Sequence, residues 1–219
     1  MNHNSYKNIG IINNMQHVDY LQIGAHVGNT TNDGLFDINE VNKNYILIEP
    51  VPHLFEQLRS NYKQKTTNNN IVFLNIAISN KDDVLSLYVP SKSNDFTKFP
   101  WFASQISSTN ADHIQTHQGV QDLIVEQVTV PCLKLNTLIN NMKIKTIDWL
   151  MVDTEGNDYD ILMSFDLTHI RPSRITFENA HMDGVFSKGE KYVKLLNYLY
   201  SHGYVKRYEN NEDTTVILL

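Results

Sequence analysis

The sequence is poor in features that would each point to a particular class of protein. Cys132 is the single cysteine, which excludes an internal disulfide and fits a reducing compartment. Lysine and arginine total 18 against 24 aspartate and glutamate residues, and the formal net charge is -6. The chain therefore lacks the positive charge that a nucleic-acid partner requires, and we expect a small-molecule or glycan partner instead.

Long apolar runs are missing as well. No apolar segment approaches the roughly 20 residues that a membrane helix needs. Residues 1–16 have neither the basic start nor the uninterrupted apolar core of a signal peptide. We therefore expect a soluble, cytoplasmic protein with no membrane partner.

The 219 residues that are present, 41% of them hydrophobic, suffice for one large domain with a buried core. We expect an N-terminal extension over 1–17 and a single domain over 18–219. Short apolar runs alternate with amphipathic stretches, which is typical of an α/β fold with a doubly wound sheet covered on both faces. Strands are expected within 20–23, 45–50, 71–79, 147–156 and 174–179, and helices within 29–38, 52–62, 157–165 and 191–203.

Two stretches depart from this alternation. Residues 203–219 contain two strand-like runs around a polar turn, which predicts an antiparallel hairpin at one sheet edge. Two β-rich runs, 84–90 and 123–131, bracket a polar segment of about 91–119 that we interpret as an insertion or lid over the site. In this segment, Trp101 and Phe102 are candidates for an apolar or sugar-stacking wall, or else for local core.

The first predicted strand runs into a turn with two glycines, Gly24 and Gly28. Because glycine has no Cβ, the backbone can turn tightly there and approach a ligand closely. The N–H groups of a following helix, capped by Asn29 or Thr30, could hold an anionic group such as a carboxylate. The alternative is an ordinary strand-to-helix turn.

An acidic residue ends the second predicted strand. Glu49 follows the glycine turn by about 20 residues, the spacing at which a carboxylate meets a ribose diol in nucleotide-binding α/β folds. Pro50 stops the strand beside it. Turn and acid together indicate an adenosine-bearing cofactor. A nicotinamide dinucleotide is disfavoured, because the turn reads G-A-H-V-G rather than G-x-G-x-x-G.

Four segments in this order, "QIGAHVG", "YILIEPVPHLFEQLRSN", "NIAIS" and "IDWLMVDTEGNDYDIL", resemble the FkbM family of S-adenosylmethionine-dependent methyltransferases. The resemblance covers about residues 18–178. It implies a class I methyltransferase (Rossmann-like) fold, a doubly wound seven-stranded sheet whose last strand is antiparallel. It also implies methyl transfer to oxygen, often on sugars or sugar-bearing natural products.

Carried over residue by residue, the resemblance assigns one set of positions to the cofactor. The turn would face its methionine end, Glu49 its ribose, and Asn75 and Ala77 its adenine. Pro50 and Asp153 are also expected among the cofactor-binding residues. The turn residues concerned are Gln22, Gly24, Ala25, His26 and Gly28.

Four positions depart from the family pattern. Gln22 replaces a usual Asp and so leaves the ammonium group of the cofactor with a neutral partner. His26, Met151 and Asn136 replace residues that are usually Asn, Lys and Asp. The replacement at Met151 changes the charge near the reacting end of the cofactor.

Acidic residues also end the later strands. Asp153 and Glu155 close the run 147–156, and Glu178 closes 174–179, so three carboxyl groups are expected at one sheet edge. Such a cluster can supply a general base, or hold a divalent cation such as Mg²⁺ that lowers the pKa of an acceptor hydroxyl. The structural alternatives are that Glu155 caps a helix and Glu178 orients a loop. His181 is a further candidate base, ahead of the insertion histidines His113 and His117.

The sequence thus predicts an S-adenosylmethionine-dependent O-methyltransferase with a small hydroxylated or sugar-like acceptor. Two alternatives stay open, a nicotinamide-dependent oxidoreductase and a binding module that keeps the cofactor pocket without catalysis. Cys132 is expected to be a buried small side chain with no chemical role.

Overall fold

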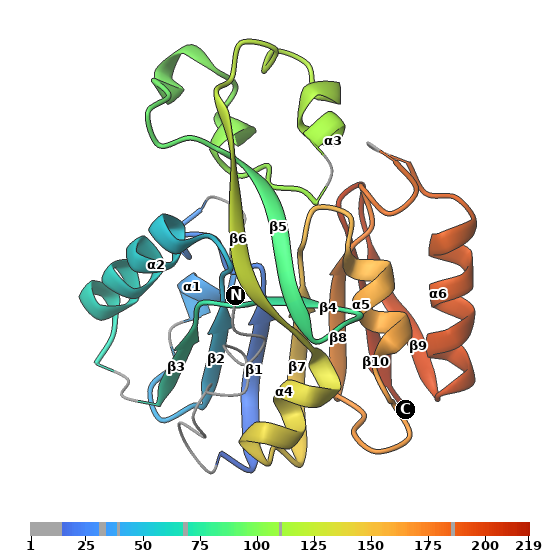
Figure 1. Ribbon diagram of the computed structural model, residues 1–219. Coiled ribbons are helices and arrows are strands. Elements are labelled where there is room, and N and C mark those ends of the chain that lie inside the picture. Colours follow the sequence, from blue (N-terminus) through green and yellow to red (C-terminus); the bar gives the residue numbers. More distant parts are fainter. Residues whose placement is uncertain (1–14, 31–33, 39, 68–69, 110, 185–186) are drawn as a thin grey trace.

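The computed structural model describes residues 15–30, 34–38, 40–67, 70–109, 111–184 and 187–219 (Figure 1). Most of the predicted N-terminal extension, residues 1–14, lies outside the described part of the chain, as does the side chain of His113. None of the described helices is long and apolar enough to cross a membrane.

The main sheet has seven strands in the order β3-β2-β1-β7-β8-β10-β9. Its strands are β1 (His17–Ile23), β2 (Tyr45–Ile48), β3 (Ile71–Leu74), β7 (Thr146–Val152), β8 (Arg174–Glu178), β9 (Tyr204–Glu209) and β10 (Asp213–Leu218). The pairs among β1, β2, β3, β7 and β8 are parallel, whereas β10 is antiparallel to both β8 and β9. This is the predicted class I methyltransferase topology, with β9 at the edge and β10 one position inside it.

Helices cover the sheet according to the alternation of its side chains. On β2, Tyr45 and Leu47 point to the face covered by α1 (Gly34–Ile38) and α2 (Pro52–Lys65). Ile46 and Ile48 point to the opposite face. There they join the large core formed with α4 (Leu135–Met142), α5 (Asp158–Ser164) and α6 (Glu190–Ser201). The prediction of strands that are apolar on both sides is confirmed for β2, all four residues of which are buried.

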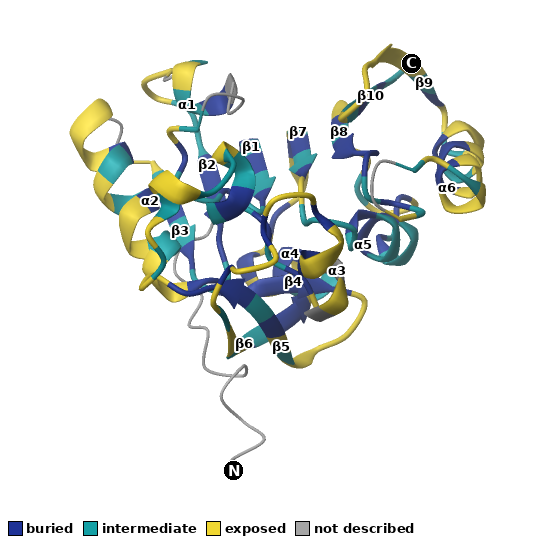
Figure 2. Ribbon diagram, turned by 90° about the horizontal axis from the view of Figure 1, so that it is seen from above, coloured by how far each residue is buried: buried dark blue, intermediate teal, exposed yellow. Residues whose placement is uncertain are grey.

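The predicted strand 71–79 is in fact two strands in different sheets. After β3 the chain leaves the main sheet, and β4 (Ala77–Ser79) pairs with β6 (Val125–Lys134), which pairs in turn with β5 (Asp83–Pro90). At the break, the amide of Asn75 donates hydrogen bonds to the carbonyl oxygens of Glu49 and Pro50, at 2.8 and 2.9 Å. This small sheet lies with α4 on one face of the main sheet (Figure 2).

The insertion between β5 and β6 is the lobe at the top of Figure 1. It contains the short 3-10 helices η2 (Phe96–Lys98) and η3 (Trp101–Ser104) and the helix α3 (Ala111–Thr116). It has a small apolar core of its own, formed by Ala103, Ile106, Ile114, Val120 and Leu123. Its function as a lid stays a prediction.

Residues 29 and 30 are not helical, and helix α1 is described from Gly34. Asn29 accepts a hydrogen bond from the side-chain amide of Asn61 at 2.9 Å. The expected helix cap at Asn29 or Thr30 stays a prediction, because residues 31–33 lie outside the described part of the chain. The helix α4 was not predicted at all.

Candidate functional site

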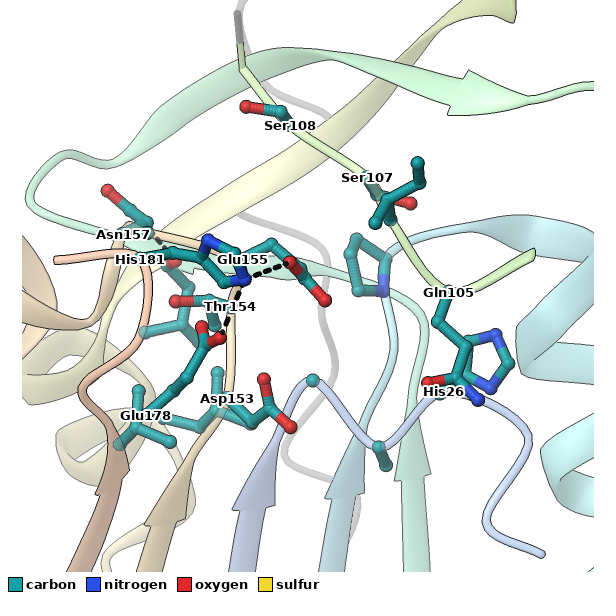
Figure 3. Close-up of a pocket in the computed structure, with 18 of the residues that line it drawn as sticks. His26, Gln105, Ser107, Ser108, Asp153, Thr154, Glu155, Asn157, Glu178 and His181 are labelled. Atoms are coloured by element: carbon teal, nitrogen blue, oxygen red, sulfur yellow. Dashed lines mark hydrogen bonds and ion pairs between the residues drawn. The ribbon is translucent and has the colours of Figure 1, made fainter. Parts of the chain in front are cut away.

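A cavity of about 800 Å³ lies at the carboxyl ends of β1, β2, β7 and β8, and residues of the insertion line it as well. This is where an open α/β sheet binds its ligands, because neighbouring connections diverge there to opposite faces of the sheet. The volume is in the range of pockets that enclose a cofactor-sized molecule. Figure 3 shows the polar side chains that face it.

One wall of the cavity is formed by Gly24, Ala25 and His26 of the glycine turn. Gly28 is not among the lining residues and packs against α2, and packing requires a glycine at both positions. A Cβ on Gly24 would lie 1.7 Å from the backbone oxygen of Asp153 on the neighbouring strand. A Cβ on Gly28 would lie 2.7 Å from the ring of Tyr62 and 2.9 Å from Leu58, both on α2. Both glycines also have positive φ angles, +82° and +78°. The turn can therefore press against β7 and α2 only because these two residues lack side chains.

Glu49 lies at the tip of β2, buried at 4% exposure. Its two carboxyl oxygens each accept a backbone hydrogen bond, from Val51 N–H at 2.8 Å and from His26 N–H at 2.9 Å. Burial raises the pKa of Glu49 to about 7, against the opposing effect of these two hydrogen bonds. Because each oxygen has a second lone pair and the residue lines the cavity, Glu49 can accept hydrogen bonds from a ribose diol.

His26 connects the glycine turn to the insertion. Its backbone has a φ of +46°, its N–H donates to Glu49, and its ring Nε2 lies 3.2 Å from the carbonyl oxygen of Ser104 in η3. Burial lowers the pKa of the His26 imidazole. The ring is therefore neutral near pH 7 and contributes a hydrogen bond rather than a charge.

The other predicted cofactor residues divide into two groups. Gln22, Ala25, Pro50 and Ala77 line the cavity together with the turn. The side chain of Asn75 instead bonds the backbone of Glu49 and Pro50, so Asn75 fixes the strand tip where β3 ends.

Three acidic residues line the opposite side of the cavity, and a fourth is buried close to them. Asp153 and Glu155 follow β7 and Glu178 ends β8, as the sequence predicts, and Figure 3 shows them beside the cavity. The fourth, Asp158 at the start of α5, was not predicted; it is 1% exposed and accepts a 2.7 Å hydrogen bond from the Thr154 hydroxyl. Sequence gave no signal for it, because its position resembles an ordinary acidic residue in the first turn of a helix.

Burial and mutual repulsion raise the pKa values of three of these acids, Glu155, Asp158 and Glu178. Burial raises the pKa of Glu155, and the nearby charge of Asp158 raises it further. For Glu178 the pKa is raised by burial and then by the charges of Asp153, Glu155 and Asp158. Burial also raises the pKa of Asp158. The cluster thus binds protons near neutral pH, as groups in a site for acid–base chemistry do.

His181 lies between two of the acids. Its Nε2 is 3.4 Å from Glu178 and 3.7 Å from Glu155, and its side chain is 8% exposed. A Cβ on Gly156 would lie 3.2 Å from the backbone oxygen of His181, so the missing side chain lets the β7–α5 loop lie against this residue. His181 thus lies beside the acid cluster, and its role as a base stays a prediction.

The insertion contributes a histidine that the sequence ranked behind His181. His117, directly after α3, is 4% exposed, lines the cavity, and has its ring 5.4 Å from that of His181. Trp101 and Phe102 also line the cavity, with Trp101 66% exposed. Only the long-range fold brings His117 to the strand ends, and no local pattern in the sequence encodes that approach.

Two other singled-out residues have structural roles. Cys132 is fully buried in β6, as predicted. The Asn136 amide donates to the Ser164 carbonyl oxygen at 2.9 Å, and its own oxygen accepts from Asp166 N–H at 3.0 Å. Asn136 therefore joins α4 to the end of α5 and is not among the residues that line the cavity.

A model of the methyltransferase FkbM domain matches residues 22–206, which include the glycine turn, Glu49 and the acid cluster. The chain belongs to the FkbM methyltransferase family. Proteins of this family take their methyl group from S-adenosylmethionine, so the match favours methyl transfer over the nicotinamide alternative. No curated protein matches the sequence significantly.

Among solved structures, the methyltransferase FkbM from Methylobacillus flagellatus KT is similar to this chain with a TM-score of 0.54 and 13% identity. The likeness covers 93% of this chain and 44% of that one, so this chain spans less than half the length of the M. flagellatus structure. The O-methyltransferase from Bacillus cereus has a TM-score of 0.45 at 12% identity, covering 92% of this chain and 74% of that one. The likeness to the M. flagellatus structure shows a shared fold.

Proposed function

We propose that this FkbM domain transfers the methyl group of S-adenosylmethionine to a hydroxyl oxygen of a small hydroxylated or sugar-like acceptor. The observation that carries the proposal is the arrangement of a single cavity. The glycine turn and Glu49 lie at one side of it, and Asp153, Glu178 and His181 lie at the other. Cofactor recognition and acid–base groups thus face the same space.

The residues at the first side suit the cofactor. Glu49 offers carboxyl oxygens to the ribose hydroxyls, and its backbone bonds to His26 and Val51 hold it in position. The apolar side chains of Ala77, Ile78 and Leu85 form a wall suited to a flat purine ring. When bound, S-adenosylmethionine supplies a methyl group on a positively charged sulfur that is a good leaving group.

The protein must then align the acceptor and remove its hydroxyl proton. We assign the removal of this proton to Asp153, which would act as the general base. Asp153 follows β7 directly, and its carboxyl group faces the cavity (Figure 3). Neutral Glu178, protonated because of burial and of the neighbouring acidic charges, can donate a hydrogen bond to an acceptor hydroxyl. The insertion residues Phe102 and His117 exclude water on the side away from the sheet.

The test is turnover with a panel of hydroxylated small molecules and glycans, followed as formation of S-adenosylhomocysteine and of a methylated product. Asp153→Asn keeps the size and hydrogen-bonding capacity of the side chain but removes the base. We expect it to bind S-adenosylhomocysteine normally and to lose about 10²- to 10⁴-fold in turnover.

Asp148→Asn is the matched control, because Asp148 lies on the same strand with an exposed side chain. It should keep wild-type turnover. Full activity in Asp153→Asn would remove Asp153 from the mechanism. Tight binding of S-adenosylhomocysteine with no turnover on any acceptor would instead support a binding module without catalysis.

A further inference from the structure

We propose that His117, Glu155 and His181 form a binding site for one divalent transition-metal ion. One ligand atom from each of the three residues lies within 4.8 Å of the other two. The residues come from three separate segments: His117 from the insertion, Glu155 from the β7–α5 loop and His181 from the segment after β8. The fold therefore brings together, at one point, donor groups that no local motif encodes.

The spacing suits an ion after small side-chain rotations. Transition-metal ions hold imidazole nitrogens and carboxylate oxygens at about 2.0 to 2.2 Å, which places ligand atoms about 3 to 3.5 Å apart. His117 is 4% exposed and the His181 side chain 8% exposed, so both rings are held within the protein rather than free in solvent. The three residues line the same cavity, from which an ion can enter.

A second observation, the lack of hydrogen bonds at two buried carboxyl oxygens, favours a cation site here. Oε2 of Glu155 and Oε2 of Glu178 are both buried and accept no hydrogen bond. Glu178 is 9% exposed, and the ion pairs that Glu155 and Glu178 form within the described residues are with His181 alone, at 3.7 and 3.4 Å. Buried carboxyl groups are normally paired or bound to a metal ion. A cation between Glu155 and the two histidines would satisfy Glu155 directly.

The chemistry of the donors selects the kind of ion. Mg²⁺ prefers an all-oxygen environment, whereas imidazole nitrogens favour later first-row transition metals such as Fe²⁺, Co²⁺ or Zn²⁺. Two histidines and one carboxylate also leave coordination positions open for water or an acceptor oxygen. This ion would differ from the magnesium expected from the acids alone, because two of its three ligands are nitrogen atoms.

Glu178 lies beside this site. Its Oε1 is 3.4 Å from Nε2 of His181, the same atom that Glu155 approaches at 3.7 Å. Because a carboxylate orients a metal-bound histidine through the other ring nitrogen, Glu178 would be a neighbouring negative charge at the ion and not the group that orients the ring. A bound ion would also take His181 out of acid–base chemistry, which agrees with the assignment of the acceptor proton to Asp153.

The experiment is a titration of the full chain with Co²⁺ after treatment with chelator and dialysis, read by the visible absorption of cobalt. We expect one Co²⁺ per chain with the intense bands of a site that contains imidazole ligands, and no displacement by excess Mg²⁺. His117→Gln, which keeps much of the side-chain volume, and His181→Ala should each weaken binding by at least about tenfold.

His169→Ala is the control, because His169 is an exposed histidine whose ion pair is with Asp166. It should leave Co²⁺ binding unchanged. Equal affinity in the wild type and in His117→Gln would overturn the proposal, as would displacement of Co²⁺ by equimolar Mg²⁺. Binding of S-adenosylhomocysteine, measured on the same samples, reports on the proposed cofactor site independently and shows that each variant is folded.

Discussion

Single residues at the strand tips determine whether the cavity can form. Gly24 has to be glycine because the backbone of Asp153 occupies the place of its side chain, and this same contact positions the acid that we assign to proton removal. Glu49 is held by two backbone N–H groups from different segments. Recognition of the cofactor and placement of the catalytic acid thus depend on the same few turn residues.

Gly24→Ala should therefore destabilise the protein strongly. Its Cβ would lie 1.7 Å from the Asp153 oxygen, so β1 and β7 would have to separate. We expect a loss of at least about 2 kcal/mol in the free energy of unfolding, measured by urea denaturation. Gly203→Ala is the matched control: its φ of +89° is similar, but the nearest atom is at an ordinary 3.6 Å. Equal losses in the two variants would contradict the argument from the contact.

The sequence located part of this site but not all of it. Glu49, Asp153, Glu155 and Glu178 could be predicted because each ends a strand, and the ends of parallel strands meet at one edge. His117 and Asp158 could not be placed, because one comes from an insertion without periodicity and the other resembles a common helix start.

At the scale of elements, the parallel strands were predictable and the connections were not. A buried strand such as β2 is a continuous apolar run, which is visible in sequence. The break after β3 depends on the bonds that Asn75 makes to another strand, and no proline or glycine marks it. The helix α4 follows β6 without a turn and ends at Lys143 in the left-handed conformation, so the usual glycine stop signal is missing.

The helix α4 is nevertheless a major part of the core. Its buried residues Leu135, Leu138, Ile139 and Met142 follow helical spacing and contact the main sheet cluster. Leu138→Ala should cost about 2 to 5 kcal/mol in the free energy of unfolding, because Leu138 is fully buried. Asn140→Ala, at an exposed position of the same helix, should change it by less than about 0.5 kcal/mol. A small effect of Leu138→Ala, measured by thermal or urea denaturation, would show that α4 is not packed as described.

At the scale of the whole molecule, buried acids at the cavity couple stability to pH. Burial raises the pKa of Glu49 from 4.5 to about 7, so the folded protein binds this proton more tightly than the unfolded chain. Its contribution is fully present below about pH 4.5 and is lost as the pH rises through about 7. The pKa of buried His26 is lowered, so its contribution to stability is lost as the pH falls. The dependence of wild-type stability on pH therefore combines the titrations of several groups.

A variant isolates the contribution of Glu49. Glutamine does not titrate, so the Glu49→Gln variant does not lose this contribution as the pH rises. The free energy of unfolding of the variant, measured relative to that of the wild type, should therefore increase from pH 5 to pH 8. The full shift of about 2.5 pKa units corresponds to at most about 3 kcal/mol. Denaturation curves at several pH values measure this, with Glu56→Gln, an exposed acid on α2, as the control. A difference that does not change with pH would mean that Glu49 is not protonated in the folded state.

The central claim is that the cavity at the strand ends holds S-adenosylmethionine with its ribose on Glu49. Calorimetric titration of S-adenosylhomocysteine into wild type, Glu49→Ala and Glu56→Ala tests it most directly. We predict that Glu49→Ala weakens binding by about 1 to 3 kcal/mol, the range for a lost hydrogen bond to a charged group, while Glu56→Ala binds like wild type. Unchanged affinity in a folded Glu49→Ala protein would contradict the assignment of the ribose to this residue.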